Sequence, residues 1–239
     1  MKAIIVAAGA GRRLLPFTEE CPKCLLQAGS RRIIDMTMDN LKKCGLKDII
    51  MVVGHQQDKI RDYLGNGVRY VVNPIYKETN SMYSLKCAQD YFGDGFVYLH
   101  SDIVFERAIL EKILSQDNEI CLSVDEVIVD AEDMKVMLEG GLIQEVNKDI
   151  PLKKAGGEFI GIAKFMGDGV RYLKETLNSL LEDRVNYNAY FEYAVEYLIK
   201  RGHKVFPSLT KNRFYAEIDT AQDLEKLNQR LSVGKVVRG

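Results

Sequence analysis

The chain contains no tryptophan, few histidines and no excess of either charge, with 33 basic residues against 34 acidic ones. A balanced charge lacks the strongly basic or acidic surface that binds nucleic acids or membranes. The apolar stretches also fall well short of the length that spans a membrane. We therefore expect neither a nucleic acid nor a membrane as partner, and the sequence leaves both a monomer and a homodimer open.

Cysteine is scarce as well, with five residues that are scattered along the chain. The N-terminal apolar run, Ala3–Ala8, is too short for the core of a signal peptide and soon meets two arginines. These features predict reduced thiols in a cytoplasmic protein. The pair Cys21-x-x-Cys24 is a candidate redox or zinc motif, but no second cysteine or histidine pair completes a tetrahedral zinc site. We interpret this pair as incidental.

The most informative segment lies at the N-terminus. The β-rich run Ala3–Ala8 breaks into Gly9-Ala10-Gly11, and Arg12, Arg13 and Lys23 follow on a loop that two prolines stiffen. Glycines let a backbone approach a ligand closely and free its N–H groups, and a polyphosphate also needs cations nearby. The pattern predicts a buried strand that leads into a nucleotide-binding loop.

Two common phosphate-binding motifs are excluded by residue identity. The dinucleotide fingerprint needs glycine where Leu14 stands, and no Gly-Lys-Ser/Thr triplet follows Gly11. The segment instead resembles the signature of the sugar-nucleotidyltransferase superfamily, Gly-x-Gly-x-Arg-Leu-x-Pro-x-Thr-x-x-x-Pro-Lys-x-Leu. The matching residues are Gly9, Gly11, Arg13, Leu14, Pro16, Thr18, Pro22, Lys23 and Leu25. Arg12 departs from the pattern, because relatives usually carry Ser or Thr there.

Downstream, strand-like and helix-like segments alternate, which predicts an α/β fold with a doubly wound, mainly parallel mixed sheet. In the second half, the strand-like segments Met134–Leu138 and Leu142–Val146 are joined by Gly140-Gly141, a strong hairpin signal. We expect one domain over residues 1–239. The resemblance implies that it has the Rossmann-like nucleotidyltransferase fold and that the inserted hairpin forms a lid on the acceptor side.

Two aspartates follow predicted strands. Asp102 comes after Phe96–Leu99, and Asp219 comes after Phe214–Ile218. Open α/β sheets bind ligands at the carboxyl ends of their strands, and Mg²⁺ prefers one or two carboxylates together with phosphate oxygens. The resemblance implies that both aspartates hold a catalytic Mg²⁺. Asp219 could instead help to begin the last helix, although a capping box at Thr220-x-x-Asp223 would leave it free.

The resemblance also implies roles for the cations. Lys23 is expected near the α-phosphate or the attacking phosphate, and Arg13 is expected to clamp the phosphates. Lys148 loosely matches a second family lysine that contacts the acceptor phosphate, and Lys135 is an alternative. The backbone expected to cover the base and triphosphate is that of Ala8, Gly9, Ala10 and Gly11.

The segment from Asn73-Pro74 through Asn80-Ser81 to Leu85 narrows the family further. It resembles the base-binding stretch of bacterial phosphocholine cytidylyltransferases and related CTP-dependent enzymes. Asn80 and Ser81 offer donors and acceptors suited to the edge of cytosine. The same two residues could simply cap a helix.

The resemblance implies a Mg²⁺-dependent enzyme that transfers CMP from CTP to a small phosphorylated or phosphonylated acceptor and releases pyrophosphate. Acceptors of this subgroup include phosphocholine, aminoethylphosphonate, phosphoglutamine-like compounds and polyol phosphates. The alternatives are a sugar-1-phosphate uridylyl- or thymidylyltransferase and, in another class, a nucleotide-sensing regulatory subunit.

The acceptor side carries a cluster of aromatic and acidic residues, Tyr187, Tyr190, Phe191 and Glu192, with Glu158 on a nearby predicted strand. A quaternary ammonium favours an aromatic cage, but this chain has no tryptophan to build one. We therefore expect a small acceptor with a polar or aminated tail, held by Glu158 and Tyr190.

Overall fold

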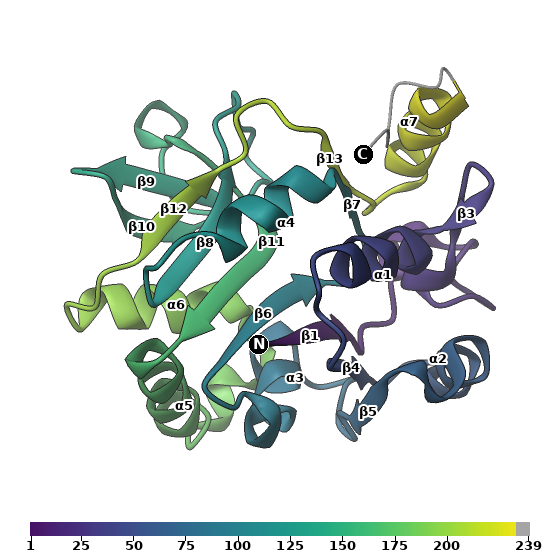
Figure 1. Cartoon of the computed structure of the whole chain (residues 1–239), viewed down its shortest axis with the longest axis horizontal. Coiled ribbons are helices and arrows are strands. Elements are labelled where there is room, and N and C mark those ends of the chain that lie inside the picture. The colour runs from purple at the N-terminus through teal and green to yellow at the C-terminus, as the bar shows by residue number, and fades with distance from the viewer. Residues whose placement is uncertain (233–239) are drawn as a thin grey trace.

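The computed structural model describes residues 1–232, in which helices cover both faces of a central sheet (Figure 1). The helices are α1 (Ile33–Lys43), α2 (Gln57–Leu64), α3 (Ser81–Cys87), α4 (Arg107–Leu114), α5 (Asp168–Leu180), α6 (Phe191–Lys200) and α7 (Ala221–Ser232). The first strands are β1 (Lys2–Ala7), β2 (Gln27–Ala28), β3 (Arg31–Arg32), β4 (Ile49–Val53), β5 (Arg69–Val72), β6 (Gly95–His100) and β7 (Ile103–Phe105). The later strands are β8 (Ile120–Asp125), β9 (Lys135–Glu139), β10 (Leu142–Asn147), β11 (Gly157–Met166), β12 (Phe206–Leu209) and β13 (Tyr215–Glu217).

The central sheet has the strand order β10-β9-β11-β6-β1-β4-β5, with β8 paired to β11 and β12 paired to β8. Strands β6, β1, β4 and β5 run parallel, whereas β11 is antiparallel to β6, β8 and β9. All five residues of β4 are buried and apolar, as expected for a parallel strand covered on both faces. The predicted doubly wound, mainly parallel mixed sheet is confirmed, with its antiparallel pairs gathered around β11.

Alternate residues of each parallel strand enter opposite layers of the core, because successive side chains of a strand point to opposite faces. Ile4 and Tyr98 pack on the side of α3, α5 and α6, whereas Ile5 and Leu99 pack on the side of α1, α2 and α4. The two helical layers are visible on either side of the sheet in Figure 1. Within residues 1–232, no helix is long and apolar enough to cross a membrane.

A small two-stranded sheet of β7 and β13 brings the two predicted aspartate segments together. Glu217 pairs with Ile103, and the backbone N–H of Ile218 donates a 3.0 Å hydrogen bond to the carbonyl of Asp102. This pairing places the end of β13 beside the end of β6. The sequence analysis identified β13 but missed β7, which is only three residues long, and also α4.

The hairpin β9–β10 forms where it was predicted, and both glycines of its turn have positive φ, +59° at Gly140 and +77° at Gly141. Helix α3 ends at Cys87 and is followed by a separate 3-10 turn, Gln89–Tyr91. The backbone N–H of Ala88 bonds to the carbonyl of Leu85, three residues back, so the chain tightens there and the α-helix stops.

Candidate active site

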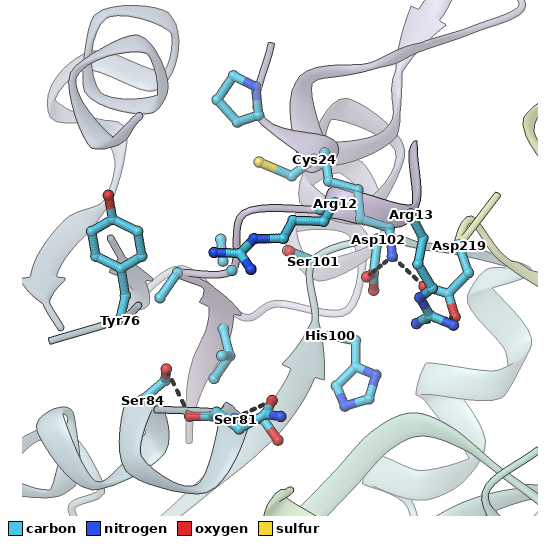
Figure 2. Close-up of a pocket in the computed structure, with 18 of the residues that line it drawn as sticks. Arg12, Arg13, Cys24, Tyr76, Ser81, Ser84, His100, Ser101, Asp102 and Asp219 are labelled. Atoms are coloured by element: carbon cyan, nitrogen blue, oxygen red, sulfur yellow. Dashed lines mark hydrogen bonds and ion pairs between the residues drawn. The ribbon is translucent and has the colours of Figure 1, made fainter. Parts of the chain in front are cut away.

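A cleft of about 460 Å³ opens at the carboxyl ends of β1 and β6 (Figure 2). This is the edge at which open α/β sheets bind ligands. The predicted site residues that line it are Ala8, Gly9, Gly11, Arg13, Lys23, Asn80, Ser81, Asp102, Tyr190 and Asp219. Ala10, Lys148 and Glu158 are not among the described residues of its lining. The cleft thus joins the N-terminal loop, the start of α3 and both aspartate segments.

Lys23 lies at the centre of the site, between the two predicted metal ligands. Its Nζ is 2.5 Å from Asp102 Oδ2 and 2.5 Å from Asp219 Oδ1. Burial alone would lower the pKa of the Lys23 ammonium, but the two carboxylates outweigh it and raise that pKa. Burial alone would raise the pKa of the Asp102 carboxyl group, but the charges of Lys23 and His100 outweigh burial and lower that pKa. The ammonium of Lys23 and the carboxylate of Asp102 are therefore both charged at neutral pH.

The N-terminal loop owes its shape to a left-handed glycine. Gly11 has φ +61°, and a Cβ at this position would lie 3.1 Å from Thr18 Cγ2. The Thr18 hydroxyl donates a 2.8 Å hydrogen bond to the Gly11 carbonyl and so closes the loop. A side chain other than hydrogen at position 11 would both strain the backbone and crowd this contact.

The two adjacent arginines of the loop point in different directions (Figure 2). Arg13 Nη2 is 2.8 Å from Asp219 Oδ2, so this guanidinium extends the charge network around Lys23. Arg12, the departure from the family signature, extends across the cleft toward Tyr76. The loop therefore presents cations on both sides of the cleft, as a polyphosphate requires.

The alternative that Asp219 caps the last helix is resolved by its neighbours. Asp223 Oδ2 accepts a 2.8 Å hydrogen bond from the backbone N–H of Thr220, and Thr220 Oγ1 accepts one of 3.3 Å from the N–H of Asp223. This reciprocal capping box provides hydrogen-bond partners for the backbone N–H groups at the start of α7. It leaves the Asp219 carboxylate for Lys23 and Arg13.

Asn80 and Ser81 lie at the start of α3, on the wall of the cleft. Asn80 is the N-cap of α3, with its Oδ1 2.9 Å from the N–H of Ser81. The Ser81 hydroxyl accepts a 2.8 Å hydrogen bond from the N–H of Phe191, at the start of α6. Both residues also line the cleft, so helix capping does not remove them from the wall on which a base would lie.

Tyr190 lines the cleft, whereas Lys148 does not and lies near the Tyr190 ring. The Lys148 Nζ is 6.0 Å from the centre of the Tyr190 ring and 3.8 Å from the Glu132 carboxylate. Lys135, the alternative cation, is buried and donates hydrogen bonds to the carbonyls of Asp130 and Ala131, at 3.2 and 3.0 Å. Lys135 thus stabilises the loop before β9, and the alternative acceptor role for it is wrong.

Glu158 belongs to an acidic group beyond the cleft. Burial and, after it, the nearby carboxylates of Asp133, Glu217 and Asp125 together raise its pKa to about 8. Of these, Glu217 lines the cleft, whereas Glu158 does not.

The cysteine pair takes no part in this network. Cys24 is buried, and burial raises its pKa to about 12, so its thiol is a poor nucleophile. Cys21 and Cys24 are both free thiols.

Two further side chains line the cleft that the sequence did not single out, one directly after the segment Phe96–Leu99 and one within Phe214–Ile218. His100 and Glu217 line the cleft, and one ligand atom each from His100, Asp102 and Glu217 lies within 4.8 Å of the others. Asp102 Oδ1 is buried and has no hydrogen-bond partner within the described part of the chain. A buried carboxylate oxygen without a partner, beside further carboxylates, suits a divalent cation. The signal available in the sequence was position alone: His100 is two residues before Asp102, and Glu217 is two residues before Asp219.

Comparison with known proteins agrees with this geometry. The family model of the MobA-like NTP transferase domain matches residues 3–139, which include the N-terminal loop, Asn80, Ser81 and Asp102. The chain belongs to this family. Members of the MobA-like NTP transferase family are nucleotidyltransferases and generally use a divalent metal. Membership of this family therefore favours an enzyme over the alternative of a nucleotide-sensing subunit without activity.

The relatives extend the likeness over nearly the whole chain. The CTP:phosphoglutamine cytidylyltransferase of Campylobacter jejuni is 26% identical over 94% of this chain and 98% of that protein. The choline-phosphate cytidylyltransferase of Streptococcus pneumoniae is 30% identical over 97% of this chain and 98% of that protein. The solved CTP:phosphocholine cytidylyltransferase of S. pneumoniae has the same nucleotidyltransferase fold, with a TM-score of 0.80, 24% identity and coverage of 96% of this chain and 98% of that one.

Proposed function

We propose that the protein is a CTP- and Mg²⁺-dependent cytidylyltransferase that transfers CMP to a small phosphorylated or phosphonylated acceptor and releases pyrophosphate. The observation that carries the proposal is Lys23 held between Asp102 and Asp219 at the carboxyl edge of the sheet. The two full-length cytidylyltransferase relatives support the choice of CTP. A CMP-5'-(3-aminopropyl)phosphonate synthase of Streptomyces rubellomurinus, 33% identical over 47% of this chain and 19% of that protein, supports a phosphonate as well as a phosphate acceptor.

The reaction joins two anions, because a phosphate or phosphonate oxygen attacks the α-phosphorus of a nucleoside triphosphate. The chain's own cations must therefore reduce the repulsion. Lys23 is placed to stabilise the charge that develops on the transferred phosphoryl group, and Arg12 and Arg13 to hold the triphosphate. The backbone of residues 8–11 approaches the nucleotide closely because Gly9 and Gly11 carry no side chain.

Asp102 and Asp219 would hold the Mg²⁺. The unpartnered, buried Oδ1 of Asp102 fits this role, and the capping box that frees Asp219 supports it. When bound, Mg²⁺ would supply further neutralisation of phosphate charge and orient the phosphates. Asn80 and Ser81 would face the base at the start of α3 and distinguish cytosine from uracil by its amino edge.

The acceptor would lie on the far side of the cleft, beside Tyr190. Its tail would meet an acidic surface, since Glu158 lies close to Glu217, which lines the cleft. An ammonium group on the acceptor would be attracted by these carboxylates and by the face of the Tyr190 ring. Lys148, 6.0 Å from that ring, would contact the acceptor phosphate or phosphonate.

A pyrophosphate-release assay tests the proposal directly. CTP, UTP, ATP and dTTP would each be combined with phosphocholine, phosphoethanolamine, aminoethylphosphonate, glycerol phosphate and glucose 1-phosphate. We expect kcat/KM to be highest with CTP and an aminated small acceptor. A clear preference for UTP or dTTP with glucose 1-phosphate would instead make the protein a sugar-nucleotide enzyme. Pyrophosphate release with none of the pairs would refute the proposed class of acceptors.

A further inference from the structure

His100 stands at the end of β6, on the floor of the cleft, where each of its two ring nitrogens faces a carboxylate. Nε2 is 3.8 Å from Glu192 Oε1, and Nδ1 is 3.8 Å from Glu217 Oε1. The Glu192 side chain is only 4% exposed, and its Oε2 has no hydrogen-bond partner among residues 1–232. The imidazole ring of His100 therefore lies between two carboxyl groups, one buried at Glu192 and one at the mouth of the cleft at Glu217.

The ring of His100 is confined by the backbone beneath it. Gly161 in β11 has φ +77°, and a Cβ built there would lie 2.6 Å from His100 Nδ1 and 2.7 Å from Cγ. Gly161 falls where the pairing of β11 with β8 is irregular, between Phe159 and Ala163. The irregular strand pairing and the absence of a side chain at Gly161 together leave the space that the imidazole ring occupies. Tyr98 and Phe159 pack edge-on against it, with ring centres at 5.4 and 6.0 Å.

The confined ring of His100 lies beside Glu217, at the edge of the site where a metal ion would bind. Glu217 is 42% exposed and belongs to the short strand β13, so little packing fixes its side chain. Its carboxylate nevertheless lies within 4.8 Å of a ligand atom of Asp102. We propose that His100 is a positioning residue, which is anchored by Glu192 and Gly161 and holds the Glu217 carboxylate beside Asp102, so that the site binds its divalent cation tightly.

A direct role of His100 as a metal ligand fits the geometry less well. A histidine ligand binds a metal through an unprotonated nitrogen, and both nitrogens of His100 are directed at carboxylates. The inference rests on the proposed function for the identity of the reaction. The expected effect of His100 on divalent-cation binding, however, can be measured without any acceptor.

The experiment compares His100→Phe, which keeps the ring packing and removes both nitrogens, with Gly161→Ala, which keeps the imidazole and displaces it. Gly141→Ala is the matched control, because Gly141 also has φ +77° but a Cβ there would meet no described heavy atom within 4 Å. Mn²⁺ binding to the whole protein is measured by electron paramagnetic resonance. The kcat and the KM for CTP are measured by pyrophosphate release.

We expect His100→Phe and Gly161→Ala to weaken Mn²⁺ binding by about 10-fold or more and to lower kcat to a similar degree, as loss of a residue that orients a ligand usually does. The KM for CTP should change by less than about twofold, because the N-terminal loop is untouched. Gly141→Ala carries the same backbone strain without the clash, so it should lose less thermal stability than Gly161→Ala and keep normal Mn²⁺ binding. A purely structural role for His100 predicts instead that His100→Phe binds Mn²⁺ normally, and this result would overturn the proposal.

A double-mutant cycle tests whether His100 acts through Glu217. If it does, His100→Phe has little further effect on Mn²⁺ binding in a Glu217→Gln background. Equal losses in both backgrounds would show that His100 acts independently, which contradicts the proposal. If no substrate pair releases pyrophosphate, the proposed function fails, whereas the Mn²⁺ measurements still decide the role of His100.

Discussion

The substitution Lys23→Met removes the central cation and keeps a side chain of similar length. It leaves Asp102 and Asp219, each 2.5 Å from the lost ammonium, facing one another. Loss of one preorganised electrostatic group commonly lowers kcat by about 10²–10³, which corresponds to roughly 2.7–4 kcal/mol of transition-state stabilisation. We expect a loss in this range, since the Lys23 side chain is only 14% exposed and is bonded on both sides.

Stability should change less than activity. Removal of one partner of a fully buried ion pair costs about 3–5 kcal/mol. Here the carboxylates of Asp102 and Asp219 are 18% and 23% exposed, and Arg13 still contacts Asp219. We therefore expect a loss of only about 1–2 kcal/mol in the free energy of unfolding, because water and Arg13 compensate part of the lost charge.

The assay is steady-state pyrophosphate release with CTP and the best acceptor of the screen, together with thermal unfolding and Mn²⁺ binding. Lys47→Met is the control, since Lys47 is exposed in the segment before β4 and does not line the cleft. Mn²⁺ should still bind to Lys23→Met, because both aspartates remain. A kcat within threefold of the wild type would refute the catalytic role of Lys23.

Three further outcomes follow from the site. Asp219→Asn should lower kcat by about 10² or more and weaken Mn²⁺ binding, with near-normal folding judged by circular dichroism; normal turnover at saturating Mg²⁺ would remove Asp219 from the site. Burial would lower the pKa of His100, but Glu217 and Glu192 raise it to about 9 from an ordinary 6.5, so the ion pair stabilises the fold below pH 6.5 and is lost as pH rises through about 9. Chemical denaturation should show that the wild type loses up to about 3 kcal/mol over this interval relative to His100→Phe, and parallel pH profiles would contradict the assignment. The pKa of Glu158 is raised to about 8, so its carboxylate gains charge between pH 7 and 9. Over this interval the KM for an aminated acceptor should fall relative to the KM for glycerol phosphate, and Glu158→Gln should abolish the difference. An unchanged profile in Glu158→Gln would exclude this contact.

Local sequence was sufficient for features that depend on neighbouring residues. The apolar run and the glycines before Arg12 predicted β1 and its loop, because strand burial and left-handed backbone leave direct marks on residue choice. The hairpin at Gly140-Gly141 and the capping box at Thr220 were predicted for the same reason. Short elements such as β7 were missed, since three residues carry too little periodicity to stand out.

The sequence by itself predicted the fold class from alternating strand-like and helix-like segments, and the glycine loop and the two aspartates at strand ends from short local patterns. Only the tertiary structure decided how these parts meet. Lys23 contacts partners 79 and 196 positions away, and no local pattern encodes such distances. The tertiary structure also decided that the buried ammonium of Lys135 donates hydrogen bonds to loop carbonyls. It likewise decided that His100 lies between two carboxylates and packs against Gly161. Burial and long-range charge pairs assign these side chains their roles, and both exist only once β6, β11, β13 and α6 have packed together.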